Sequence, residues 1–142
     1  MIIGTISAFI ATIGFSIFFH VPKKELVFCG GIGALGWLAY LLCNHFNASL
    51  IIANFAGALV VSEGSILLAR LRKMPVTVFL ISGIIPLVPG APTYQAMYAL
   101  LTGDHLEALG YASYAFQSAA VIAGAIVVTT MLPRIFGKGL KS

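Results

Sequence analysis

The chain has 142 residues, of which 60% are apolar and 8% are charged, whereas about 25% of residues are charged in an ordinary soluble domain. This composition, with a mean hydropathy of +1.04, excludes a soluble globular protein and a disordered one. The net charge of +4 is too small for the basic surface of a nucleic-acid-binding protein. The sequence therefore predicts an all-α integral membrane protein, with a single transmembrane domain over residues 1–142.

Five hydrophobic runs come close to the ~20 residues that a membrane-spanning helix needs. They cover residues 2–20, 26–44, 48–71, 76–102 and 106–132. The first run has no basic segment before it, and Val21-Pro22-Lys23-Lys24 follows it in place of a small-residue cleavage site. We therefore expect this run to be a retained transmembrane helix and not a signal peptide.

The basic residues predict the orientation of these five helices. All of them lie in the first break, in the third break or in the C-terminal tail: Lys23, Lys24, Arg70, Arg72, Lys73, Arg134, Lys138 and Lys141. Five crossings place all of these positions on one side, and the positive-inside rule makes that side the cytoplasm. We therefore expect the N-terminus outside and the C-terminus inside. This one-sided charge disfavours insertion in both orientations, so an inverted-topology partner would have to be a different chain, or another part of one.

Several patterns that resemble catalytic or cofactor motifs have simpler interpretations. The glycines of residues 31–36 match the dinucleotide-binding fingerprint, but they lie inside an apolar run, where small residues allow close helix packing. Cys29 and Cys43 are fourteen positions apart on one helix, about 21 Å, which is too far for a disulfide. The three histidines lack metal-ligand spacing. No catalytic set is present, so we expect no enzyme activity, no metal and no cofactor.

The fourth run is interrupted near its midpoint by Pro86, Pro89, Gly90 and Pro92. Prolines lack the N–H that would bond the carbonyl four residues earlier, so the carbonyls of residues 82, 85 and 88 are freed. We expect the fourth helix to be broken here and to restart at Pro92.

The N–H groups of Thr93, Tyr94 and Gln95 would then face the break, together with their side chains. Such a helix N-terminus can bind a substrate carboxylate, so this segment is the predicted substrate site. The alternative is a proline kink that shapes packing alone.

Polar side chains within the other runs are further candidates. Glu63 is the acid inside a run, so it could couple transport to protons, or pair with Arg70 or a partner subunit. Asn54, Tyr114, Gln117 and Ser118 could line a pathway or form interhelical hydrogen bonds. The fifth run is rich in small residues, which predicts tight helix packing: Ala112, Ala115, Ala119, Ala120, Ala123, Gly124 and Ala125.

Two segments resemble the threonine/serine exporter family, in its small five-span domain. One is Ile85-Pro86-Leu87-Val88-Pro89-Gly90 with Tyr94 and Met97, and the other is residues 14–22; Met74-Pro75 also fits. The resemblance identifies Pro86, Pro89, Gly90 and Tyr94 as motif positions and leaves Pro92 outside the pattern. It implies export of threonine and serine, or of succinate in some two-chain versions, by a small chain that works with a larger membrane subunit.

These observations together predict the small subunit of a secondary exporter of small carboxylate-bearing metabolites in a prokaryotic cytoplasmic (inner) membrane. Its expected partners are the larger subunit, the substrate and the lipid bilayer. Two alternatives stay open, namely a non-transporting assembly or regulatory subunit and a homo-oligomeric channel.

Overall fold

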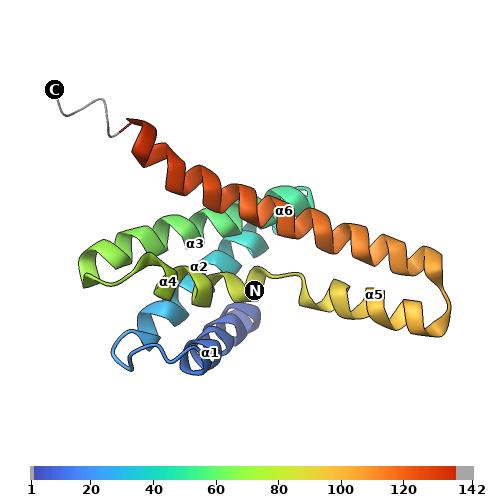
Figure 1. Ribbon diagram of the computed structural model, residues 1–142, viewed down its shortest axis with the longest axis horizontal. Helices are drawn as coiled ribbons and strands as arrows, with labels where there is room; N and C mark the ends of the chain where they lie inside the picture. The colour runs from blue at the N-terminus through green and yellow to red at the C-terminus, as the bar shows by residue number, and fades with distance from the viewer. Residues whose placement is uncertain (1, 137–142) are drawn as a thin grey trace.

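The chain is built from helices that occupy most of the predicted hydrophobic runs (Figure 1). The computed structural model describes the backbone of residues 2–136 and the side chains of residues 2–131. The elements, in chain order, are α1 (Ile2–Phe18), α2 (Leu26–His45), α3 (Leu50–Arg72), α4 (Val76–Ile84), the 3₁₀ turn η1 (Ile85–Leu87), α5 (Gly90–Thr102) and α6 (His105–Phe136). No strand occurs among the residues described, so the all-α prediction is confirmed.

Three helices are long and apolar enough to cross a membrane, namely α2, α3 and residues His105–Met131 of α6. The segments Val76–Leu87 and Gly90–Thr102 pass the same test as a pair, with a bend of 52° between them. Helix α1 is apolar but has 17 residues, which is the short end of the range for a spanning helix. The chain therefore has the helices of a multi-pass membrane protein, while the count of five spans stays a prediction.

The helix ends follow local rules of backbone chemistry. Helix α3 ends at Lys73, whose φ of 54° is left-handed, and Pro75 then caps the start of α4. Helix α5 ends at Gly103 with a φ of 87°, a conformation that glycine adopts without steric cost. The side chain of Asp104 then accepts a hydrogen bond from the N–H of Glu107, at 3.1 Å, and so caps α6.

Helices α1–α4 and η1 pack on one another, and we call this group the body. Glycines on α2 and α3 allow its helices to approach closely. A Cβ atom on Gly33 would collide with the side chain of Thr12 on α1, and one on Gly36 would collide with Val61 on α3. Gly57 on α3 lies against Leu87 of η1, where a Cβ would be 2.9 Å from a leucine methyl. The predicted role of the α2 glycines in packing is thus confirmed for Gly33 and Gly36, whereas Gly31 faces open space.

Helix α5 and the first half of α6 form a hairpin that extends away from this body (Figure 1). Within the described chain, α5 contacts α6 and no other helix, whereas α6 also packs against α3. The prediction that the small residues of α6 pack tightly is wrong for most of them. Ala125 is fully buried, but the following are exposed: Ala112, Ala119, Ala120 and Ala123. No helix within the described chain covers these four alanines.

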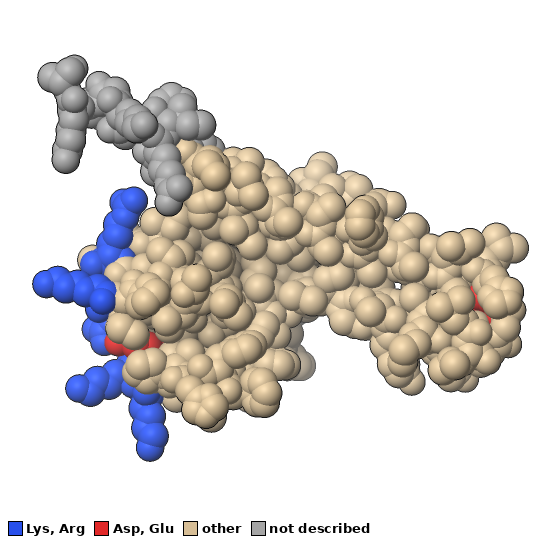
Figure 2. Space-filling model, viewed as in Figure 1, with Lys and Arg blue, Asp and Glu red and all other residues tan. Residues whose placement is uncertain are grey.

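Charged side chains occupy the two ends of the molecule. Figure 2 shows the described Lys and Arg side chains at one end, around the α1–α2 and α3–α4 connections. An acidic group lies at the opposite end, at the tip of the α5–α6 hairpin, where the chain carries Asp104 and Glu107. The gathering of basic residues at one end, which the sequence predicts, is therefore present for the Lys and Arg residues between positions 23 and 73. Lys138, Lys141 and the side chain of Arg134 lie outside the described residues.

Candidate functional site

The break in the fourth run is present where the prolines predict it. Helix α4 ends at Ile84 and the 3₁₀ turn ends at Leu87. Pro89, with φ −74° and ψ 61°, is the central residue of an inverse γ-turn, in which Gly90 N–H donates to Val88 O at 2.7 Å. Val88 N–H donates to Ile85 O at 3.1 Å. Two carbonyls that the prolines release are thus paired again within the break.

The helix restarts at Gly90 and not at Pro92, so the predicted restart is wrong by two residues. Thr93 N–H donates to Pro89 O at 3.2 Å, and the Thr93 hydroxyl donates to the same carbonyl at 2.7 Å. Tyr94 and Gln95 follow Thr93, past the positions whose N–H groups are free at a helix start. This N-terminus therefore offers an anion fewer donors than the sequence suggested.

A cavity of about 440 Å³ lies against the break, and we call it the break cavity. Trp37 and Tyr40 of α2 stack on one another, with ring centroids 5.1 Å apart, on one side of it. Asn54 of α3 and Ser118 of α6 close another side and share a hydrogen bond of 3.3 Å. The remaining lining residues are Tyr114 and residues 86–92. Four parts of the chain that are distant in sequence therefore meet at the broken helix.

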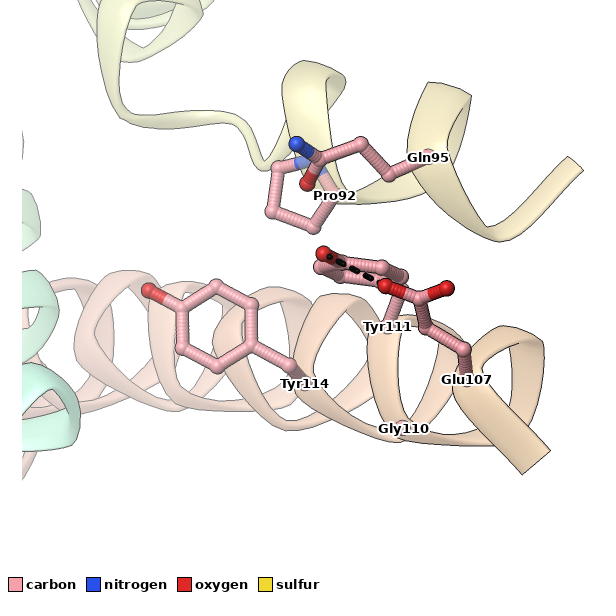
Figure 3. Close-up of a pocket in the computed structure, with 6 residues that line it drawn as sticks. All are labelled: Pro92, Gln95, Glu107, Gly110, Tyr111 and Tyr114. Carbon is pink, nitrogen blue, oxygen red and sulfur yellow. Dashed lines mark hydrogen bonds between the residues drawn. The ribbon is translucent and has the colours of Figure 1, made fainter. Parts of the chain in front are cut away.

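A second cavity, of about 460 Å³, lies between α5 and α6, and we call it the hairpin pocket. Figure 3 shows Gln95 of α5 and Glu107 and Tyr111 of α6 pointing toward the same space. The Tyr111 hydroxyl donates to Oε1 of Glu107 at 3.3 Å. Pro92 and Tyr114 line both the hairpin pocket and the break cavity. The two cavities are therefore neighbours that share a wall.

The predicted substrate residues are divided between these cavities and the surface. Pro86, Pro89 and Gly90 line the break cavity, and Gln95 lines the hairpin pocket. Thr93 is exposed. Tyr94 is 65% exposed and stacks on Tyr98, with centroids 6.4 Å apart, so it lines neither cavity.

The predicted pathway residues are also divided. Asn54, Tyr114 and Ser118 line the break cavity, whereas Gln117 is exposed and lines neither cavity. The bond between Asn54 and Ser118 is the interhelical hydrogen bond that the sequence left open as the alternative. These two side chains therefore both face the cavity and join α3 to α6.

Glu63 lies on an exposed face of α3, away from both cavities. Among the described side chains, it forms no ion pair with Arg70 or with any other residue. A carboxylate on the outer surface of an apolar helix is costly in lipid. A role for Glu63 therefore depends on what lies against this face of α3.

The ion pair of the described chain is at the basic end, between Glu25 and Arg72. Arg72 Nη2 is 2.7 Å from Oε1 of Glu25, and Arg72 Nε donates to Oε2 at 3.0 Å. The guanidinium also lies 4.6 Å from the ring centroid of Phe28. The hydrogen bonds from Arg72 lower the pKa of Glu25 below its ordinary value, against the effect of desolvation. This contact joins the start of α2 to the end of α3.

Sequence reasoning missed the aromatic and acidic side chains Trp37, Tyr40, Glu107 and Tyr111, which line the cavities. For α6, a signal was available in the spacing of residues 107, 111, 114 and 118, which places them on one helix face. Glu107 lies two positions beyond Gly103-Asp104-His105, at the start of the fifth hydrophobic run, so the sequence alone does not distinguish it from a charge of the connection. Within residues 2–131, no group of three or more His, Cys, Asp or Glu side chains is arranged to hold a metal ion.

Comparisons with known proteins identify relatives of this chain. An uncharacterized protein of Haemophilus influenzae is 29% identical over 133 residues, which cover 89% of this chain and 44% of the relative. The chain thus spans less than half of that relative's length. No solved structure matches this chain. The family model described as "Threonine/Serine exporter, ThrE" matches residues 4–136. The chain, a multi-pass membrane protein with a broken helix beside a cavity, therefore belongs to the threonine/serine exporter family.

Proposed function

We propose that this chain is the small subunit of a secondary exporter of small carboxylate-bearing metabolites, such as threonine, serine or succinate. The observation that carries the proposal is the broken fourth run beside the 440 Å³ break cavity. Transporters of several folds bind substrates near the middle of the membrane, where a discontinuous helix lines a cavity. Pro86, Pro89 and Gly90, which line the cavity here, are positions of the segment that resembles the family's signature.

A larger membrane subunit is the proposed partner. The α5–α6 hairpin contacts the rest of the chain through α6 alone, and its outer surface carries exposed apolar side chains such as Leu101, Leu106 and Phe116. The H. influenzae relative has more than half of its length outside the matched region. A second membrane unit would cover the hairpin and complete the pathway.

The positive-inside rule gives the proposed orientation. The Lys and Arg cluster is cytoplasmic, the N-terminus and the tip of the α5–α6 hairpin are external, and five helices cross a prokaryotic inner membrane. In this arrangement, the break cavity lies between the two faces and the hairpin pocket lies on its external side. Substrate would therefore pass from the break cavity to the hairpin pocket during export.

Proton coupling through Glu63 is part of the proposal. Glu63 lies within a predicted membrane-spanning helix, where an acid needs a polar environment. Its exposed position on α3 would allow a partner subunit to provide that environment. Glu63→Gln keeps the shape of the side chain and cannot exchange a proton. We expect the variant to export at a rate that no longer changes with pH. Unchanged pH dependence would remove Glu63 from the mechanism.

The test of the proposed function is efflux of labelled threonine, serine and succinate from preloaded proteoliposomes. The chain is reconstituted alone and together with the larger subunit. Flux that requires both chains is the expected result, and the transported compound defines the substrate class. Equal flux from this chain alone would support a homo-oligomeric channel. No flux of any of the three compounds from the assembled pair would contradict the proposal.

The hydrogen bond between Asn54 and Ser118 favours one alternative, an assembly subunit whose polar residues hold helices together. The double substitution Pro89→Leu with Gly90→Leu separates the two functions. Space is open around Gly90, where a Cβ atom would have no neighbour within 4 Å beyond the adjoining backbone, so the added side chain should be tolerated. A pathway role predicts lost flux with the complex assembled. An assembly role predicts normal flux or a complex that fails to form.

A further inference from the structure

A third cavity, of about 260 Å³, lies at the basic end of the molecule, and we call it the basic-end pocket. Its walls come from the α1–α2 connection and from α4, so it shares no lining residue with the break cavity or the hairpin pocket. Its apolar lining residues are Phe19, Val21, Pro22, Val78 and Ile81, and its polar ones are His20, Thr77 and Ser82. The pocket is therefore separate from the proposed substrate pathway.

The turn that ends α1 forms one wall of this pocket. His20 adopts a left-handed φ of 58°, and the N–H of Val21 donates to the carbonyl of Ser16 at 3.0 Å. This arrangement ends the helix, because a left-handed residue cannot continue a right-handed helix, and the chain then lies against α4. Phe19 on this wall and Ile81 on the facing one are each 48% exposed. The pocket is therefore an apolar groove that is open at the surface.

Positive charge borders this groove on two sides. Lys23 and Lys24 follow directly after the last pocket residue of the connection, and Lys73 lies four positions before the first pocket residue of α4. All three lysines are exposed, and none of them forms an ion pair within the described chain. The adjoining acid, Glu25, is bound by Arg72 at 2.7 Å, so its charge is already balanced. Figure 2 shows the basic side chains spread outward around this end.

An apolar groove with a cationic rim matches the chemistry of an anionic phospholipid. The basic end of a membrane protein lies at a membrane surface, where lipid headgroups and the first part of their acyl chains are within reach. A small free anion would gain nothing from the apolar walls. A zwitterionic lipid would gain little from the lysines, because its own cationic group offsets its phosphate. Basic pockets between membrane helices bind the headgroups of anionic lipids for these reasons.

We infer that the basic-end pocket binds one anionic phospholipid, whose phosphate is held by Lys23, Lys24 and Lys73 and whose acyl chain lies against Phe19 and Ile81. The bound lipid joins the α1–α2 connection to the start of α4 and so stabilises the folded chain. This inference goes beyond the proposed function, because it assigns a lipid site and does not depend on which compound is transported.

The test is native mass spectrometry of the full chain in detergent micelles. The chain is titrated with phosphatidylglycerol, or with phosphatidylcholine that has the same acyl chains. We expect one phosphatidylglycerol to bind with an apparent Kd about ten-fold lower than that of phosphatidylcholine, because the lysines attract the net charge of the lipid. The bound lipid should also raise the melting temperature of the chain.

The charged rim is tested by Lys23→Gln. We expect this variant to raise the Kd of phosphatidylglycerol about five-fold, the effect of one lysine near an anionic lipid surface, and to leave the Kd of phosphatidylcholine unchanged. Arg70→Gln is the matched control, because it removes the same charge at the same end, yet no residue of α3 lines the pocket. This control should keep the native Kd for both lipids.

The apolar groove is tested by Thr77→Trp, which leaves the net charge unchanged. Thr77 is exposed and lines the pocket, so an indole ring there would take the space of the acyl chain. We expect this variant to lose the tightly bound phosphatidylglycerol. Thr102→Trp is its control, since Thr102 is also exposed but lies at the hairpin tip and does not line the pocket. Without lipid, both variants should melt at the temperature of the native chain.

Several outcomes would overturn the inference. Equal binding of the two lipids would exclude a site for anionic headgroups, and equal losses from Lys23→Gln and Arg70→Gln would assign the attraction to net charge. Full affinity in Thr77→Trp would exclude the groove. Binding to the chain alone but not to its pair with the larger subunit would make the partner the occupant of the pocket. None of these results depends on transport, so the proposed function would stand or fail separately.

Discussion

The closest helix contacts of the body depend on single glycines of α2. Gly36 lies where a Cβ would collide with a methyl group of Val61 and would be 3.3 Å from the carbonyl oxygen of Gly57. Neither neighbour can move freely, because Val61 is fully buried and the carbonyl belongs to the backbone of α3. Membrane helices gain stability from such close approaches, since lipid offers no hydrophobic driving force between them.

We therefore expect Gly36→Ala to lower the free energy of unfolding by about 1–3 kcal/mol, the usual cost of overpacking. The measurement is reversible unfolding in mixed micelles. Gly31→Ala is the matched control, because Gly31 lies on the same helix and faces open space. Alanine favours helix over glycine, so this variant should be as stable as the native protein or more stable. Equal losses for both variants would contradict the close-contact argument.

The ion pair between Glu25 and Arg72 gives the stability of the chain a dependence on pH. Hydrogen bonds from Arg72 lower the pKa of Glu25 in the folded protein below its ordinary value of 4.5. A lowered folded-state pKa stabilises the fold above the unfolded-state pKa, and this contribution is lost as the pH falls through the folded-state pKa. We expect the melting temperature of the native protein to fall below about pH 4.5 by more than that of Glu25→Gln.

Arg72→Gln provides the complementary test, since it leaves the buried Glu25 carboxylate without its donor. This variant should unfold at a lower temperature near pH 7, where the native pair is intact. Arg70→Gln is the control, because Arg70 is exposed and forms no ion pair within the described chain. Similar losses from Arg70→Gln and Arg72→Gln would assign the effect to net charge and not to the pair. The sequence did not predict this contact, because Glu25 and Arg72 are 47 positions apart and meet only once α2 and α3 pack.

At the scale of elements, the break in the fourth run was predictable and the restart of the helix was not. Pro86 and Pro89 each remove an N–H from the middle of a run, which predicts a break there in any context. Pro92 is tolerated at every position of a first turn, because no N–H there has an intrahelical partner. It therefore does not define which residue is first, and the turn at Pro89 makes Gly90 the start.

Two side-chain pairs join α3 to α6, and they can be tested as elements of one interface. Asn54 bonds to Ser118 at 3.3 Å, and further along both helices the hydroxyls of Ser62 and Thr129 share a short hydrogen bond. Interhelical hydrogen bonds in membrane proteins contribute about 0.6 kcal/mol on average and at most about 1.7 kcal/mol. We expect double-mutant cycles with alanine to give a coupling energy of this size for each pair.

The cycles are measured by unfolding in mixed micelles, with Asn54 and Thr129 as a crossed control pair. Residues on opposite ends of the interface share no partner, so their substitutions should be additive within about 0.5 kcal/mol. A coupling near zero for Asn54 and Ser118 would mean that their bond does not hold the helices together. The role of these two side chains would then be to line the break cavity.

At the scale of the whole molecule, the composition predicted a helical membrane protein and the Lys and Arg pattern predicted a basic end, because both follow from the cost of placing charge in lipid. The small residues of α6 were interpreted as tightly packed, yet Ala112, Ala119 and Ala123 are exposed. Small residues indicate that some helix approaches closely, but they do not say which one. The break cavity was unpredictable for the same reason, since its walls come from helices distant in sequence.

The exposed surface of the α5–α6 hairpin gives the last prediction, which concerns the partner. Phe116 is 77% exposed on the part of α6 that carries the hairpin, and Ile10 is 64% exposed on α1. The two residues have similar exposure, but α5 contacts only α6, whereas α1 packs on α2 and α4. We therefore expect the larger subunit to cover the hairpin and not α1.

A photoreactive benzoylphenylalanine at position 116 should form a cross-linked product with the larger subunit in the membrane, identified by mass spectrometry. The same residue at position 10 is the control and should react with lipid alone. A product of twice the 15.0 kDa mass of this chain from position 116 would indicate a homo-oligomer in place of the proposed pair. Cross-linking from position 10 and not from 116 would place the partner on α1, and the hairpin would then face lipid.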